Sequence, residues 1–160
     1  MQWGVLAFWG LFGAALTRVR RGGAILCACL VGAMAAQLAL LRADGLLTLG
    51  SALPLHLCSF SAMLCLPMLL QRRVGFLLSW MLLLGAPCAL LALAFPAVAN
   101  CSRPLAMQLA FYSLHALILC AAAFRLRLTR ELPRCPRETL LTLNGLAALA
   151  SVVNRSIGSN

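Results

Sequence analysis

Six long apolar runs, separated by short polar segments, divide the chain almost from end to end. A helix that crosses a hydrocarbon core about 30 Å thick needs some 20 residues at about 1.5 Å each. Most of the runs approach that length, and the first is shorter. We therefore expect an all-α, polytopic membrane bundle of about six transmembrane helices, with residues 1–160 forming one transmembrane domain. The runs lie near residues 3–16, 24–41, 53–70, 74–95, 105–124 and 139–157.

The composition argues against a water-soluble fold. Hydrophobic residues make up 63% of the 160 residues and charged residues only 10%, against about 25% charged in ordinary soluble domains. A chain this short would bury only a modest part of its surface if it folded in water. The apolar side chains therefore need lipid as their solvent, and membrane lipids are the expected partners.

The basic residues are all arginines, and they gather at the ends of the apolar runs. The formal net charge is +10. Loops one, three and five hold ten arginines, whereas loops two and four hold one each. Because arginine-rich loops stay in the cytoplasm, we expect both chain ends to lie outside. A nucleic-acid partner is not expected, because that function needs a solvated basic face with polar and aromatic partners.

The eight cysteines do not form CxxC pairs, and most lie inside apolar runs. There a free thiol behaves as a small hydrophobe, so we expect neither a disulfide framework nor a zinc site. Cys27 and Cys29 resemble a metal hook only weakly, and Cys101 falls in an external loop without an obvious partner. No charged residue lies deep in a run, which argues against an ion-coupled pump and against a carboxylate metal centre. No cofactor is expected.

Three polar residues from three different runs reach a similar depth. Counting from the cytoplasmic arginines at about 1.5 Å per residue gives roughly 21 Å for Cys58, roughly 15 Å for His115 and roughly 22 Å for Asn154. His115 brought near Cys58 would draw off the thiol proton and yield a nucleophilic thiolate. A packing role for the cysteine and an interhelical hydrogen bond from the histidine are the alternative interpretations.

His56 is a second histidine close to the same cysteine. Proline is favoured at the first helical position, so the third helix is expected to begin near Pro54 with His56 in its first turn. On one helix, His56 and Cys58 would point about 200° apart. The two cannot form a tight pair, and His115 is the better partner for Cys58.

Three segments carry a resemblance to a known family. The string LPLHLCSFSAML at residues 53–64 resembles the motif that opens a central span in the YwaF-like family of bacterial integral membrane proteins. FYSLHALIL at 111–119 resembles the aromatic-rich segment with a histidine in that family, and VVNRSIGSN at 152–160 resembles its C-terminal ending. CALLALAFP at 88–96 keeps the family's proline but lacks its glutamine and threonine. The resemblance implies a multi-pass protein of the bacterial plasma membrane.

The YwaF-like family is similar to a eukaryotic transmembrane protein described as a cysteine-dependent acyltransferase acting on ether phospholipids. That similarity implies an acyl-accepting nucleophile at Cys58, with His115, or as second choice His56, as its base. It also implies that Asn154 or Asn160 orients the base or polarises the carbonyl.

Three functions from different classes remain open at this point. The first is a lipid acyltransferase that works through a thioester on Cys58. The second is a small-solute transporter or permease subunit, as a monomer or a homo-oligomer, whose polar cluster binds the solute. The third is a membrane scaffold without chemistry, whose arginine-rich fifth loop binds anionic lipid or a partner.

Overall fold

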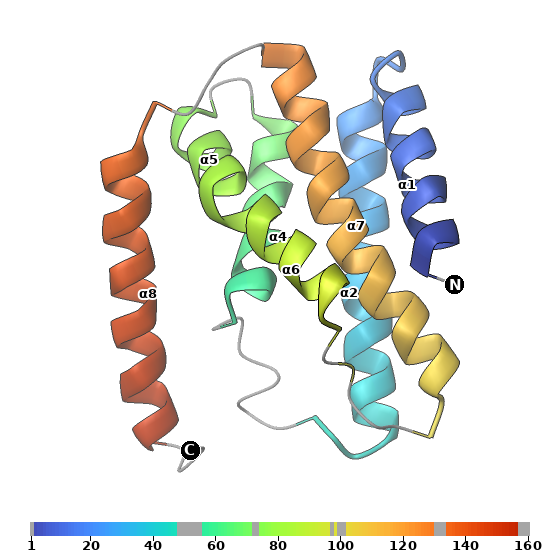
Figure 1. Ribbon diagram of the computed structural model, residues 1–160, viewed down its shortest axis with the longest axis vertical. Coiled ribbons are helices and arrows are strands. Elements are labelled where there is room, and N and C mark those ends of the chain that lie inside the picture. The colour runs from blue at the N-terminus through green and yellow to red at the C-terminus, as the bar shows by residue number, and fades with distance from the viewer. Residues whose placement is uncertain are drawn as a thin grey trace.

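The computed structural model describes residues 2–47, 56–71, 74–96, 98, 102–129 and 134–156, and the regular elements within these ranges are all helices (Figure 1). The all-α bundle expected from the sequence is therefore confirmed, and the helices follow the six apolar runs. They are α1 (Gln2–Leu16), α2 (Gly22–Ala43), α4 (Leu57–Leu70), α5 (Gly75–Trp80), the π-helix η1 (Met81–Gly85), α6 (Ala86–Ala94), α7 (Pro104–Thr129) and α8 (Pro136–Ser156).

Three stretches of the described chain are long and apolar enough to cross a membrane, namely α2, the continuous stretch from α5 through η1 to α6, and α7. The helices α1 and α4 are apolar but shorter. Helix α8 has 21 residues and is less apolar than these three stretches. The chain thus has the makeup of a membrane protein.

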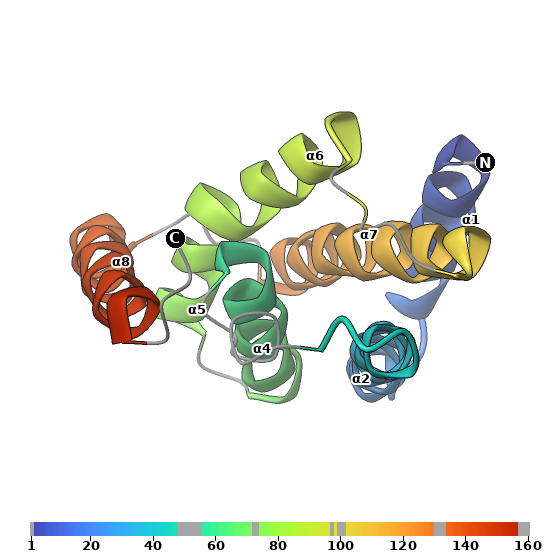
Figure 2. The same cartoon turned by 90° about the horizontal axis from the view of Figure 1, so that it is seen from below.

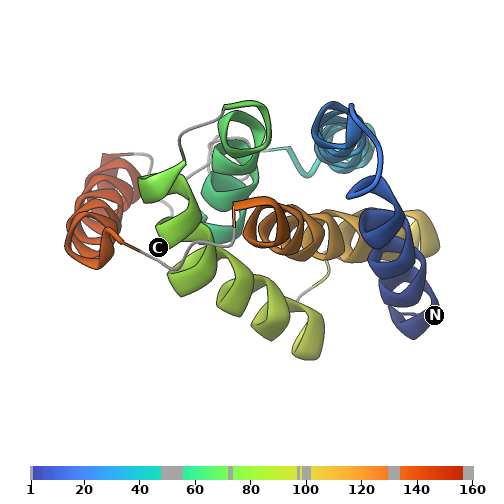
Figure 3. The same ribbon diagram turned by 90° about the horizontal axis from the view of Figure 1, so that it is seen from above.

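Helix α7 is the central element of the bundle. Seen end-on, α2 and α4 lie on one side of it and α1 and α6 on the other (Figures 2 and 3), and all four pack against it. Helix α8 stands at the edge and packs against α5. The buried core joins both sides through α7, because large apolar side chains from α2, α4, α5 and α7 meet there. Those with almost no exposed surface include Leu26, Leu30, Met68, Leu78, Trp80, Leu117 and Ile118.

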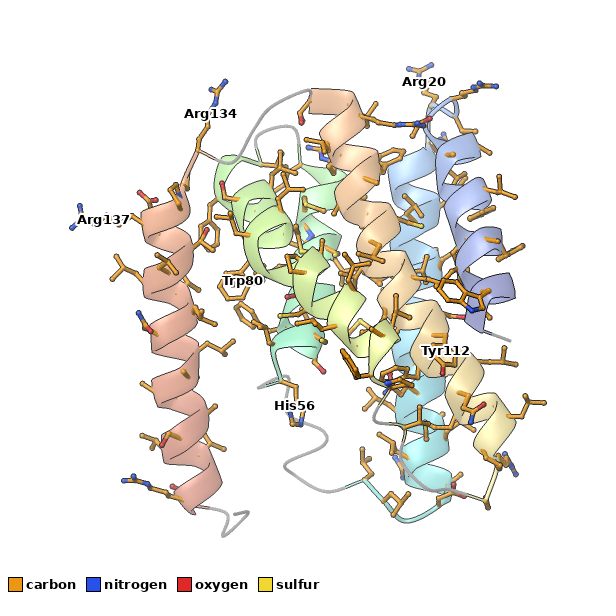
Figure 4. All side chains as sticks on the ribbon, viewed as in Figure 1. Arg20, His56, Trp80, Tyr112, Arg134 and Arg137 are labelled. Carbon is orange, nitrogen blue, oxygen red and sulfur yellow. The ribbon has the colours of Figure 1, made fainter. Side chains whose placement is uncertain are left out.

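The first and fifth loops, which are rich in arginine, share one end of the bundle. Arg20, in the turn after α1, and Arg134, just before α8, lie at the same end, whereas His56 lies toward the other (Figure 4). Asp44 and Ser102 link the connections at the end opposite the arginines, where the Ser102 amide donates to an Asp44 carboxylate oxygen at 3.0 Å. Arg72 and Arg73 of the third loop lie outside the described residues.

The fourth apolar run is not a continuous α-helix. Pro87 has no amide hydrogen, so the carbonyl four residues earlier loses its usual donor. The chain adapts with one turn of π-helix at Met81–Gly85, in which the Ala86 amide donates to the Met81 carbonyl. A π-turn of this kind changes which side chains share a face of the helix. It therefore affects which side chains of this run can face α4.

The start of α4 differs from the sequence-based expectation. The helix begins at Leu57, and His56 precedes it in an extended conformation with φ −75° and ψ 137°. The His56 carbonyl accepts the first bond of the helix, from the Phe60 amide at 2.9 Å. His56 is therefore the N-cap residue rather than a member of the first turn, and Pro54 lies outside the described residues.

Candidate functional site

Cys58 lies on the face of α4 that is turned into the bundle. Ser61, Ala62 and Cys65 follow it at intervals of three, four and seven residues, and all three are buried. Residues at these intervals share one face of a helix. Cys58 itself is half-buried, so it sits where this packed face opens.

The wall opposite this face is built by the π-turn. The Trp80 indole nitrogen donates to the Ser61 hydroxyl at 3.0 Å, and the Cys65 thiol donates to the Met81 sulfur at 3.7 Å. At Gly85, a Cβ atom would lie 2.7 Å from the end of the Met81 side chain and 3.3 Å from the Ser61 Cβ. Helix α4 therefore packs closely against η1, directly beside the turn that carries Cys58.

Cys88 of α6 is a neighbour of Cys58, since α4 and α6 are in contact. Cys88 follows Gly85 by three residues, so it continues the face that meets Ser61. The sequence contains a signal for this neighbour, which is the distance of each cysteine from the loop between them. Cys58 precedes Arg72 by 14 residues and Cys88 follows Arg73 by 15, so the shared loop sets both thiols at nearly the same depth.

The cysteines of the bundle differ in what their thiols contact. The Cys27 thiol donates to the Leu66 carbonyl at 3.5 Å and the Cys120 thiol to the Trp9 carbonyl at 3.0 Å. Cys65 has no exposed surface and contacts Met81. Cys58 and Cys88 make no hydrogen bond within the described part of the chain. All seven described cysteines are free thiols, and Cys101 lies outside the described residues.

His115 is buried in α7, with 5% of its surface exposed. Its Nδ1 atom lies 2.8 Å from the Phe111 carbonyl oxygen, and its ring packs on the Phe111 ring with 4.2 Å between centroids. A carbonyl oxygen only accepts hydrogen bonds, so Nδ1 carries the hydrogen in the neutral ring. The other nitrogen, Nε2, is then the basic one.

The Nε2 atom of His115 has no hydrogen-bond partner among the described residues. It is not fully buried, so part of its surface remains accessible. His115 also lies about 140° around α7 from Cys120, whose thiol contacts α1. The imidazole therefore points in a different direction around α7 from the thiol that contacts α1, and both α4 and α6 pack against α7.

The structure brings the helices of Cys58 and His115 into contact, because α4 packs against α7. It does not join the two side chains by a hydrogen bond within the described residues; the ring contacts the Phe111 carbonyl instead. His56 is exposed and precedes α4. The Asn154 side chain and Asn160 lie outside the described residues, and the helix that carries Asn154, α8, packs against α5.

In the part of the chain that the structure describes, no three His, Cys, Asp or Glu side chains come together in a way that would hold a metal ion. The polar groups that remain for chemistry at this site are the Cys58 and Cys88 thiols and the His115 imidazole.

No curated protein and no solved structure matches this chain. A sequence model of the TMEM164 family matches residues 3–160, which is nearly the whole length and includes both Cys58 and His115. The chain therefore belongs to the TMEM164 family, a family of transmembrane proteins.

Proposed function

We propose that this chain is a lipid acyltransferase of the membrane, which carries the acyl group as a thioester on Cys58. The observation that supports this most strongly is the state of the Cys58 thiol together with its place on α4. Cys27, Cys65 and Cys120 donate to named acceptors, whereas Cys58, like Cys88, is half-buried and without a hydrogen bond in the described chain, and its helix packs against the helix of His115. A nucleophilic cysteine must be reachable and not held in a packing contact.

The geometry of His115 suits the role of base for this thiol. Its Nδ1 is held by the Phe111 carbonyl, which fixes the tautomer and leaves Nε2 able to accept a proton. In many cysteine enzymes a third group orients the base, and here a backbone carbonyl does so. Asn154, Asn160 or His56 would then hydrogen-bond the acyl carbonyl or another part of the substrate, because the imidazole Nδ1 already has a partner.

The proposed reaction has two transfers with an ester phospholipid as donor. In the first, Nε2 of His115 takes the proton from the Cys58 thiol and the thiolate attacks the ester carbonyl. The ester C–O bond breaks, and the leaving lysolipid oxygen receives the proton from His115. In the second, the hydroxyl of a lysolipid acceptor gives its proton to His115 and attacks the thioester. The C–S bond breaks, and the Cys58 thiolate recovers the proton.

The cellular setting of this proposal follows the resemblance to YwaF-like proteins. It is a multi-pass protein of the bacterial plasma membrane, with the arginine-rich end in the cytoplasm and the site toward the outer half. His56 lies at the end of the bundle away from Arg20 and Arg134 (Figure 4), which supports that orientation of α4. Membrane lipids diffuse directly to such a site, so a lipid substrate suits it.

The test is covalent labelling of the purified protein with a phospholipid that carries a terminal alkyne on its acyl chain. Wild type is expected to take up a label that neutral hydroxylamine removes, because hydroxylamine cleaves thioesters. Cys58→Ala is expected to abolish it. Replacing His115 with glutamine is expected to slow labelling about 10²- to 10⁴-fold, the usual contribution of a general base.

Cys88→Ala is the matched control, since it removes the neighbouring thiol at the same depth and leaves Cys58. It is expected to label like wild type. Label that persists in Cys58→Ala, or that disappears in Cys88→Ala alone, would contradict the assignment of Cys58. Uptake of a solute that needs His115 but not Cys58 would instead favour the permease.

A further inference from the structure

A cavity of about 300 Å³ lies between α1 and α7. A second cavity, of about 570 Å³, lies between α1, α2 and α7, and Trp9 of α1 lines it. The first cavity has a small-residue wall on α1 and an arginine on α7. Its lining includes Gly10, Gly13, Ala14, Cys120, Phe124 and Arg127.

The shape of the first cavity follows from glycines that play different roles. At Gly13 the two helices nearly touch, since a Cβ atom there would lie 3.2 Å from both the Cβ and the sulfur of Cys120. The contact is closed by the Cys120 thiol, which donates to the Trp9 carbonyl at 3.0 Å. At Gly10, in contrast, a Cβ atom would meet nothing within 4 Å. The helices are therefore held in contact at one point and leave an apolar crevice beside it.

The charge at the mouth of this crevice is strongly positive. Arg127 belongs to the lining and is exposed. Arg18, Arg20 and Arg21 follow α1 and are exposed at the same end of the bundle. Among the described residues, the lining contains neither aspartate nor glutamate. The crevice thus combines an apolar interior with a cationic entrance.

We infer that the α1–α7 crevice is a binding site for an anionic phospholipid of the leaflet at the arginine-rich end. One acyl chain lies along Gly10 and Ala14, and the phosphate meets Arg127. The volume is at the lower end of the about 300–1,000 Å³ typical of ligand pockets, which suits a single acyl chain. The described residues that line the crevice include neither Cys58 nor His115, so this lipid is a separate ligand from the substrate of the proposed transferase.

The experiment is native mass spectrometry of the purified chain titrated with two phospholipids of identical acyl chains, one with an anionic and one with a zwitterionic headgroup. We expect the anionic lipid to bind more tightly. Arg127→Gln should weaken its binding about fivefold, which is the effect of one arginine near an anionic lipid surface. Gly10→Leu should abolish binding by filling the crevice, and Gly10→Ala should weaken it to an intermediate level.

Matched controls exist on α1 and on α8. Gly4→Leu adds the same bulk to α1, at another position where a Cβ atom meets nothing. Arg137→Gln removes an arginine at the same end, on α8 away from the crevice (Figure 4). Both should bind the anionic lipid like wild type. Gly4→Leu should fold like wild type, which would show that α1 tolerates a leucine and that lost binding in Gly10→Leu is not a folding defect. Gly10→Ala gives a second measure of lipid binding with a smaller side chain.

Equal affinity for the two headgroups, or wild-type binding by Gly10→Leu, would overturn the site. Competition by inorganic phosphate alone would also overturn it, because that result would mean an anion site without an acyl chain. The transferase proposal stands or fails separately, since it depends on Cys58 labelling.

Discussion

At the scale of single residues, some buried polar groups of the described chain are paired with one another, whereas others have no hydrogen-bond partner. The Ser61 hydroxyl and the Trp80 indole are fully buried and satisfy one another. The Cys58 thiol and the His115 Nε2 are not satisfied in this way within the described residues. Unpaired polar groups in an apolar interior cost free energy, so groups left open at a site are the natural candidates for binding a substrate.

The Ser61–Trp80 pair gives a prediction at this scale. Ser61→Ala would leave the indole N–H buried without an acceptor, which typically costs about 1–3 kcal/mol. We expect a lower unfolding midpoint in detergent for this variant. Ser59→Ala, two residues earlier on α4, removes a hydroxyl that makes no hydrogen bond to the described residues, so it should unfold like wild type. Equal midpoints for the two variants would mean that the pair contributes nothing to stability.

At the scale of elements, the apolar runs predicted the helices well, because membrane length and hydropathy dominate where a helix begins and ends. The breaks within runs were harder to predict. Pro87 was visible in the sequence, but periodicity alone does not indicate that the chain responds with a π-turn at Met81–Gly85. The start of α4 moved from Pro54 to Leu57, and Cys88 became a neighbour of Cys58 through the packing of α4 on that turn.

The sequence also did not predict how α8 attaches to the rest of the bundle. The buried Ser79 hydroxyl of α5 accepts hydrogen bonds from the amides of Arg134 and Cys135, at 3.0 and 3.1 Å, and donates to the Gly75 carbonyl. These two amides lie just before α8, where backbone donors lack partners within the helix. One side chain in the fourth run therefore fixes the start of the last helix.

Removal of that hydroxyl should loosen α8 alone. In Ser79→Ala the two amides lose their acceptor, and we expect hydrogen exchange at the start of α8 to accelerate about fivefold to tenfold, as loss of about 1 kcal/mol implies. The exchange of α4 and α7 should stay unchanged. Thr142→Ala is the control, because that hydroxyl donates only within α8, to the Glu138 carbonyl at 2.8 Å. Acceleration of the same size in both variants would contradict the anchoring role of Ser79.

At the scale of the whole molecule, α7 divides the bundle into two functional sides. Cys120 and Arg127 lie on the part of α7 that lines the crevice with α1, whereas His115 points about 140° away from Cys120 around the helix. The sequence predicted the pairing of the third and fifth runs, which the packing of α4 on α7 supports. It could not predict the crevice between α1 and α7, because a cavity depends on how closely two helices approach, which the residues of one helix do not determine alone.

The central claim is that His115 activates the Cys58 thiol across the α4–α7 contact. The most direct measurement is the rate at which iodoacetamide alkylates each cysteine, resolved by peptide mass spectrometry, in wild type and in His115→Gln. We expect Cys58 to react fastest in wild type and about tenfold more slowly in the variant, because the thiolate fraction follows the neighbouring base. Cys88 should react at the same rate in both proteins. A Cys58 rate that does not change in His115→Gln, or a Cys88 rate that equals it, would contradict the account.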